Sequence, residues 1–285
     1  AKHVGKIVLS FGRDFDTRIR AGATYLVTGG LSGLGLATAQ WLAERGATRL
    51  ALVGRSGAAT AAAVDAVEEL RNAGVDVLTI AADVGRAEEC ARVFAALAGG
   101  PELRGIVHAA GVLSDGTIEQ LEWDDFERVF AAKVTGAWHL HELLPGRALD
   151  FFVLFSSASA LIGTPGQGNY ATANAFLDSL AHARRASGLP ATSINWGPWG
   201  ELGMAAGLAA NAQQKWDRLG IGLIDRRQGL AVLEQVMAGD VTQVGVLPIN
   251  WHQLARSVPG GIVPTLFADL AARGGSSRAG TALAP

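Results

Sequence analysis

The sequence predicts an α/β protein built on a doubly wound parallel sheet of about seven strands, with helices on both faces. Two observations predict this class. Short apolar runs alternate along the chain with longer stretches of helical periodicity, and the runs end in Gly, Asp or Ser. Strands that alternate with helices are joined by right-handed crossovers, which bury a parallel sheet between two helical layers.

Seven apolar runs have the length of buried strands, and six longer stretches have the period of helices. The expected strands are 24–28, 49–54, 75–81, 105–109, 151–156, 191–195 and 243–247. The expected helices are 34–45, 61–73, 87–98, 123–144, 170–187 and 227–238. Residues 4–11 could add a strand outside this alternation, and no repeat of 20 to 50 residues is found.

Length and composition restrict the function classes. With 285 residues, of which 49% are hydrophobic and 18% charged, the chain suits one large domain, and a second full domain is not expected. A net charge of −2 argues against nucleic acid or an anionic membrane as partner. The single cysteine, Cys90, excludes an internal disulfide and favours a reducing, cytoplasmic setting. Residues 151–177 carry no charge, but Ser156 and Pro165 interrupt them, so we interpret them as an interior strand and a loop.

A glycine-rich turn joins the first expected strand to an Ala-rich helix. Its residues are Gly29, Gly30, Ser32, Gly33, Leu34 and Gly35, with the spacing Gly-x-x-x-Gly-x-Gly. Glycines permit a tight turn and close approach of the backbone to a pyrophosphate, whose charge the helix amino terminus favours. The turn therefore predicts dinucleotide binding in a Rossmann-type fold, the alternatives being a structural turn or a methyltransferase loop.

Residues that end the next strands indicate which dinucleotide binds. Arg55 and Ser56 stand where an NAD-specific site would present an acidic residue, and an arginine pairs with the 2′-phosphate of NADPH. An exposed loop arginine is the alternative. Residues 83–84 and 109–111 end the following strands and are candidate walls for adenine and ribose, namely Asp83, Val84, Ala109, Ala110 and Gly111. Asp83 could equally be a helix cap.

Four polar residues fit the needs of a carbonyl reductase. Reduction of a ketone requires a proton for the developing alkoxide, and a phenol can supply it if a nearby positive charge lowers its pKa from about 10. Tyr170 is the suitable phenol and Lys133 the only lysine within the alternating core, while Ser157 could bind the carbonyl and Asn174 shares the helical face of Tyr170. Taken singly, each residue has a structural alternative. Tyr170 could be a packing residue and Lys133 a surface charge. Ser157 could form a turn, and Asn174 could be an ordinary polar residue of the helix.

Together these motifs resemble the short-chain dehydrogenase/reductase superfamily. Residues 168–178 (GNYATANAFLD) and 195–199 (NWGPW) more narrowly resemble the catalytic half of a polyketide synthase ketoreductase, and the similarity covers about residues 21–250. In the superfamily the lysine follows the tyrosine by four positions. Here Asn174 holds that position, the exchange typical of polyketide and animal fatty acid synthase ketoreductases.

The resemblance implies NADPH-dependent reduction of a 3-oxoacyl chain, held as a thioester on an acyl carrier protein, in polyketide or fatty acid assembly. Tyr170 would protonate the oxygen, Ser157 would orient it, and Lys133 would assist the phenol and the nicotinamide ribose. Tyr170, Lys133 and Gly197 would also contact the cofactor. The alternatives are a noncatalytic NADPH-binding scaffold and a free-standing reductase of small alcohols or ketones.

The stereochemical class and the substrate contacts are also suggested by the resemblance. Residues 113–115 (LSD) match two of the three positions of the Leu-Asp-Asp signature of B-type ketoreductases, which form the 3R alcohol, and Ile162 replaces the tryptophan of A-type members. Asp115 could instead cap a loop. The Ala- and Gly-rich residues 201–222 suggest a lid, with Trp199 and Met204 in reach of substrate.

The domain limits follow from the same comparison. We expect a linker or the tail of a preceding domain at 1–20, the catalytic domain at 21–255, and an extension with a flexible linker at 256–285. Residues 4–9 resemble the closing strand of an enoylreductase. The expected partners are therefore an acyl carrier protein, the missing structural half of the ketoreductase and an adjacent enoylreductase domain.

Overall fold

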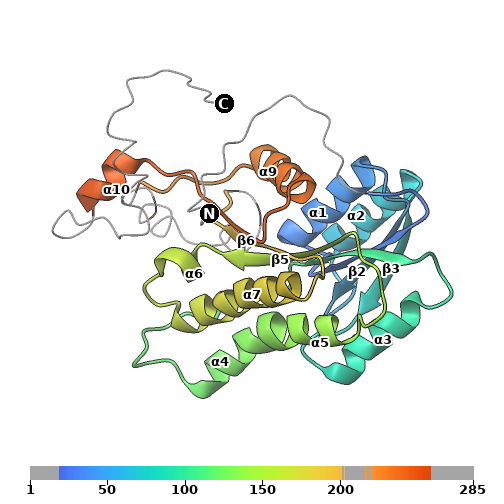
Figure 1. Cartoon of the computed structure of the whole chain (residues 1–285), viewed down its shortest axis with the longest axis horizontal. Coiled ribbons are helices and arrows are strands. Elements are labelled where there is room, and N and C mark those ends of the chain that lie inside the picture. Colours follow the sequence, from blue (N-terminus) through green and yellow to red (C-terminus); the bar gives the residue numbers. More distant parts are fainter. Residues whose placement is uncertain (1–18, 201, 203–215, 217, 219, 258–285) are drawn as a thin grey trace.

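A computed structural model describes residues 19–200, 202, 216, 218 and 220–257, in which seven parallel strands form one sheet (Figure 1). The strand order is β3-β2-β1-β4-β5-β6-β7. The strands are β1 (Thr24–Thr28), β2 (Arg49–Gly54), β3 (Asp76–Ala81), β4 (Leu103–His108), β5 (Phe151–Ser157), β6 (Thr192–Trp196) and β7 (Gln243–Val246). The order runs outward in both directions from β1 and β4, so the prediction of a doubly wound, Rossmann-type sheet is confirmed. The strand expected at 4–11 lies outside the described residues.

Helices cover both faces of the sheet. One face carries α1 (Gly33–Glu44), α2 (Ala61–Asn72) and α9 (Arg226–Ala238), and the other carries α3 (Ala87–Leu97), α5 (Gly136–Glu142) and α7 (Gly168–Ala186). Each layer closes its own apolar core against the sheet, which is why the strands are buried on both sides. Two short helices, α6 (Ser159–Ile162) and α10 (Trp251–Ser257), were not expected. Within the described ranges no helix is long and apolar enough to cross a membrane.

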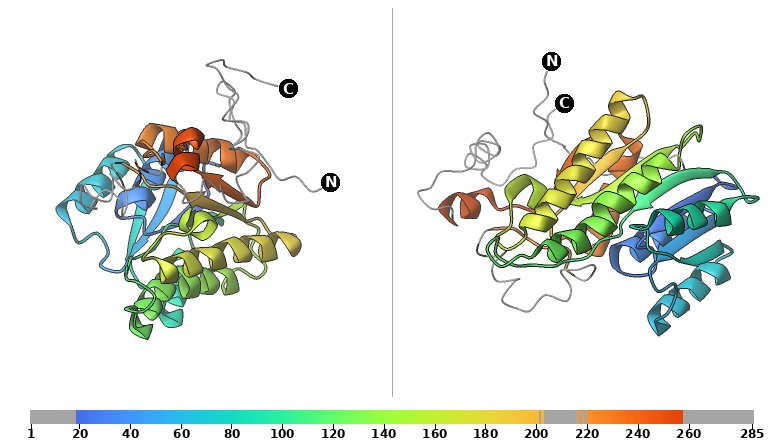
Figure 2. Two further views of the ribbon diagram at one scale, coloured as in Figure 1. Left: turned by 90° about the vertical axis from the view of Figure 1, so that its left-hand side faces the viewer. Right: turned by 90° about the horizontal axis from the view of Figure 1, so that it is seen from below.

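The single helix expected over 123–144 contains a local change of period. α4 (Trp123–Phe130) continues through a π-helical turn, η1 (Ala131–Thr135), into α5. The loop after β3 packs tightly on this turn, because a Cβ at Gly136 would lie 2.8 Å from Val84 Cγ2. Figure 2 (right) shows the α4–η1–α5 helix beside α7. The π turn is therefore held between the loop after β3 and α7.

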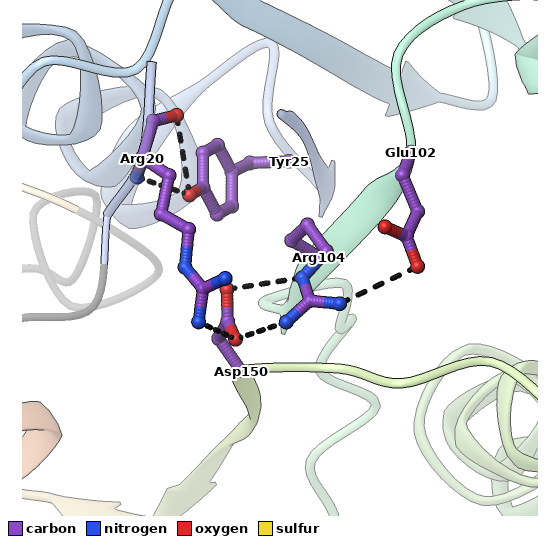
Figure 3. Close-up of polar contacts among 5 residues, drawn as sticks. All are labelled: Arg20, Tyr25, Glu102, Arg104 and Asp150. Carbon is purple, nitrogen blue, oxygen red and sulfur yellow. Dashed lines mark hydrogen bonds and ion pairs between the residues drawn. The ribbon is translucent and has the colours of Figure 1, made fainter. Parts of the chain in front are cut away.

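An ion-pair cluster closes the amino end of the sheet (Figure 3). The buried carboxylate of Asp150, just before β5, accepts hydrogen bonds from Arg20 at 2.8 Å and from Arg104 at 2.7 Å. The Tyr25 hydroxyl accepts a bond from the Arg20 backbone N–H at 2.6 Å, and its ring stacks on Phe151. Tyr25 is thus a packing residue at the edge of the sheet opposite the carboxyl ends of the strands, as its position in a buried strand predicts.

Candidate active site

Two adjacent cavities open at the carboxyl ends of the strands. The first, which we call the phosphate cavity, lies between the β1–α1 turn and the ends of β2 and β3. The second, the reaction cavity, lies between β5, β6 and the start of α7. The strand end after β4 joins them, because Ala109 lines the reaction cavity and Ala110 lines the phosphate cavity.

The β1–α1 turn forms a cradle that only glycine allows. Gly29 has a φ of +67°, and a Cβ there would lie 2.9 Å from the carbonyl oxygen of Ala109. A Cβ at Gly30 would lie 2.7 Å from the carbonyl oxygen of Val27. Ser32 is the N-cap of α1, but its side chain makes no capping hydrogen bond. The amino end of α1 therefore keeps its donors and its dipole for an anion.

The predicted cofactor residues of the other strand ends line this cavity. They are Arg55, Ser56, Asp83, Val84, Ala110 and Gly111, together with Gly29 and Ser32. Arg55 is exposed and makes no ion pair or hydrogen bond with the described part of the chain. Asp83 is not a helix cap: its Oδ1 accepts a bond from Gly85 N at 2.9 Å, and Arg86 is the N-cap of α3.

The reaction cavity brings together three of the four predicted catalytic residues, Lys133, Ser157 and Tyr170. The Lys133 side chain is buried, its Nζ donates to the Phe155 carbonyl oxygen at 2.8 Å, and it lies 5.3 Å from the centre of the Tyr170 ring. Ser157 Oγ accepts from Ser159 N at 3.2 Å, which leaves the hydroxyl proton for another acceptor. The ammonium faces the phenol ring and not bulk solvent.

Burial is the main influence on the pKa values of Tyr170 and Lys133. It raises the pKa of Tyr170 to about 12, although hydrogen bonds from Asn174 and Ser157 act in the opposite direction. Burial also lowers the pKa of Lys133 to about 7, opposed by the negative charge of Asp178. The expectation of a lowered phenol pKa is therefore wrong for this structure, because desolvation outweighs the favourable hydrogen bonds.

Asn174 holds the helix that carries the phenol. It is buried, and its Nδ2 donates to the Tyr170 carbonyl oxygen at 2.7 Å. The Asn174 carbonyl oxygen in turn accepts a bond from Ser156 Oγ at 3.2 Å, and Asn195 Nδ2 donates both to Ser156 Oγ and to Asp178. This buried polar network ties α7 to β5 and β6. Sequence reasoning missed Asp178 and Asn195, although a carboxylate and an amide within apolar stretches could have signalled them.

The loop after β4 is joined to the reaction cavity by a hydrogen bond between Asp115 and Gln167. Asp115 is exposed and accepts a bond from Gln167 Nε2 at 3.0 Å; Gln167 and Leu113 line the reaction cavity, whereas Asp115 does not. Ser114 Oγ, at the position where this chain departs from Leu-Asp-Asp, donates to Asp125 of α4 at 2.7 Å. An aspartate there would face a like charge.

The far wall of the reaction cavity is aromatic. Trp196 packs edge to face against Phe155 and against Trp199, with ring centres 5.6 Å and 5.1 Å apart. Gly197 and Trp216 continue the wall. Trp199 is buried and lines the cavity, as expected for a residue in reach of substrate. Met204 lies outside the described residues, as does most of the expected lid.

The fold and the glycine cradle are those of a Rossmann-type dinucleotide-binding protein. A family model described as the KR domain matches residues 23–201. The chain is 38% identical over 297 residues to a phenolphthiocerol/phthiocerol polyketide synthase protein of Mycobacterium tuberculosis, covering 99% of this chain and 13% of that protein. It is 41% identical over 276 residues to spectinabilin polyketide synthase system protein NorB of Streptomyces orinoci, covering 95% of this chain and 12% of that protein.

Solved structures agree with these relatives. An A1-type ketoreductase superposes with a TM-score of 0.82 at 36% identity, covering 89% of this chain and 54% of that one. The chain therefore belongs to the KR-domain family, the ketoreductase domains of polyketide synthases. It spans only 13% and 12% of these two curated relatives, so those proteins contain much that this chain does not.

Proposed function

We propose that this chain uses NADPH to reduce a 3-oxoacyl thioester, carried on an acyl carrier protein, to the 3-hydroxyacyl thioester during polyketide chain assembly. One observation carries the proposal. A buried lysine amine, a phenol and a serine hydroxyl meet in a cavity that adjoins a glycine cradle. This is the set of groups that carbonyl reduction needs.

The phosphate cavity suits NADPH. The glycines that a Cβ would block and the uncapped amino end of α1 fit a pyrophosphate. The exposed guanidinium of Arg55, free of partners among the described residues, fits a 2′-phosphate and favours NADPH over NADH. When bound, this cofactor supplies the hydride.

The protein's own groups handle the carbonyl oxygen and the proton. Ser157 Oγ donates a hydrogen bond to the substrate carbonyl and orients it, while Tyr170 transfers its hydroxyl proton to that oxygen as negative charge develops there. The ammonium of Lys133, held by the Phe155 carbonyl, stabilises the phenolate left behind. Asn174 ties α7 to β5, because its carbonyl oxygen accepts a hydrogen bond from Ser156 Oγ.

The experiment mixes the chain with NADPH and a short 3-oxoacyl thioester and follows the near-ultraviolet absorbance of the reduced nicotinamide. Turnover that Tyr170→Phe and Lys133→Met abolish supports the proposal. Binding of NADPH without turnover would instead identify a noncatalytic scaffold. Equal rates on carrier-bound thioesters and on free small ketones would point to a free-standing reductase.

We further propose a B-type product, the 3R alcohol, because Leu113 and Asp115 keep two positions of the B-type signature and Ile162 replaces the A-type tryptophan. The bond between Gln167 and Asp115 supports a role for that loop at the cavity mouth. Chiral chromatography of the product tests this. Recovery of the 3S alcohol would refute it.

The remaining partners are also proposals. Solved relatives are about twice as long as the matched part of this chain, which supports a missing structural half, and residues 4–9 suggest an adjacent enoylreductase. A thermal melt with and without a co-expressed structural half tests the first partner. An unchanged melting temperature would count against it.

A further inference from the structure

His108 is a polar residue that the proposed chemistry does not use. It is the last residue of β4, it is fully buried, and it lies beside Thr28, the last residue of β1. Its Nδ1 is 2.7 Å from Thr28 Oγ1. A buried imidazole costs free energy unless its nitrogens are bonded, so its presence at a strand end needs a reason.

The other side of the ring faces the turn that carries Lys133. A Cβ at Gly136 would lie 3.4 Å from His108 Cε1, which places the start of α5, directly after η1, against the ring. The backbone of Lys133 and Ala132 opposes the lowering of the His108 pKa by burial, which places these two residues of η1 close to the ring, although Nε2 makes no hydrogen bond with the described residues. An Nε2–H directed at η1 would have the carbonyl oxygens of these two residues as its acceptors.

The protonation state of the ring fits this arrangement. Burial lowers the pKa of His108 to about 3, and the nearby charge of Lys133 acts in the same direction. The imidazole is therefore neutral at working pH and carries one proton. With that proton on Nε2, toward the turn, Nδ1 accepts from the Thr28 hydroxyl.

We propose that His108 is a positioning residue for Lys133. Its ring links the end of β1, next to the glycine cradle, to η1, and so fixes where the ammonium sits relative to Tyr170. This inference rests on the proposed role of Lys133. It adds a structural connection between the end of β1, beside the phosphate cavity, and the lysine of the reaction cavity.

Three substitutions separate the two sides of the ring. The amide nitrogen of a glutamine can occupy the place of Nε2, and the amide of an asparagine the place of Nδ1. His108→Gln should rescue kcat to within roughly threefold of the wild type, whereas His108→Asn and His108→Phe should lower kcat by roughly tenfold or more, since small misplacement of a catalytic group is costly. The NADPH Kd, measured by fluorescence titration, should change by less than about twofold in all three.

A purely structural role predicts a different pattern. The three variants would then have equal kcat values, or kcat would follow the melting temperature alone, and either result overturns the inference. If the His108 variants fail to fold, the pair Thr28→Ser and Thr28→Val tests the same link from β1. The serine variant should rescue kcat and the valine variant should lower it by roughly fivefold or more, and equal values would overturn the inference.

The Lys133→Met variant shows whether a negative result refutes the positioning role of His108 or the proposed function itself. If Lys133→Met keeps the wild-type kcat, the proposed role of Lys133 is wrong and the inference falls with it. If Lys133→Met is inactive while the three His108 variants have equal kcat values, the proposed role stands and only the positioning role of His108 is refuted.

Discussion

Replacing Lys133 with methionine should abolish activity and yet stabilise the folded chain near neutral pH. Burial lowers the pKa of Lys133 from 10.5 to about 7. Since one pKa unit corresponds to about 1.4 kcal/mol, holding the ammonium in the fold costs about 5 kcal/mol at low pH. Methionine has a similar shape and no charge, but it leaves the Phe155 carbonyl oxygen without its donor, which costs about 1–3 kcal/mol. The net gain below pH 7 is therefore about 2–4 kcal/mol.

The sign of the pH dependence follows from proton binding. Between pH 7 and pH 10.5 the unfolded lysine is protonated and the folded lysine is not, so wild-type stability rises with pH through this window by about 1.4 kcal/mol per unit. The advantage of Lys133→Met should thus shrink as pH rises and reverse near the top of the window. Urea unfolding of both proteins from pH 6 to about pH 9.5 measures it.

A second buried cation provides the control. Arg184 is also buried, but its pKa falls only to about 10, so it stays protonated in both states over most of this range. The stability difference between the wild type and Arg184→Met should therefore stay nearly constant up to about pH 9. If the stability difference between the wild type and Lys133→Met is equally constant with pH, the lysine pKa is not lowered in the fold. The free-energy cost assigned to the buried ammonium would then be refuted as well.

Three further outcomes test other parts of the molecule. Tyr170→Phe should lower kcat by roughly 100-fold or more in the thioester assay with little change in melting temperature, because the ring remains and only the proton donor is lost. Arg55→Ala should raise the Kd for NADPH by roughly tenfold and leave that for NADH unchanged in fluorescence titrations; equal changes would contradict 2′-phosphate recognition. Asp150→Asn should lower the free energy of unfolding by about 2 kcal/mol in urea unfolding, because Arg20 and Arg104 lose their anion. The kcat should stay unchanged, because the candidate site lies at the opposite edge of the sheet.

The strand and helix pattern was predictable because it depends on periodicities that a sequence displays. β1 and β5 lie within one residue of their expected limits, since an uninterrupted apolar run has few other uses in an α/β chain. The π turn at 131–135 was not predictable, because one extra residue in a turn leaves the apolar period of a long helix almost unchanged. α6 and α10 are too short to show a period of their own.

The members of the candidate site were predictable, but their electrostatics were not. Lys133, Ser157 and Tyr170 were chosen for their chemistry and the structure brings them into one cavity. Their pKa values depend on burial, which arises when η1, β5 and α7 close around them. A single sequence shows the charge of a lysine and says nothing of the water removed from it.

The high pKa of the phenol is compatible with reduction and unfavourable for the reverse reaction. A proton donor for a ketone must hold its proton until hydride arrives, and burial keeps Tyr170 protonated across the physiological range. An alkoxide is far more basic than a phenolate, so a phenol with a pKa of about 12 still gives up its proton to it. Oxidation of an alcohol would instead need Tyr170 as a phenolate base before the reaction, and the same burial opposes that charge. In the proposed mechanism the ammonium of Lys133 then acts after proton transfer, when it stabilises the newly formed phenolate.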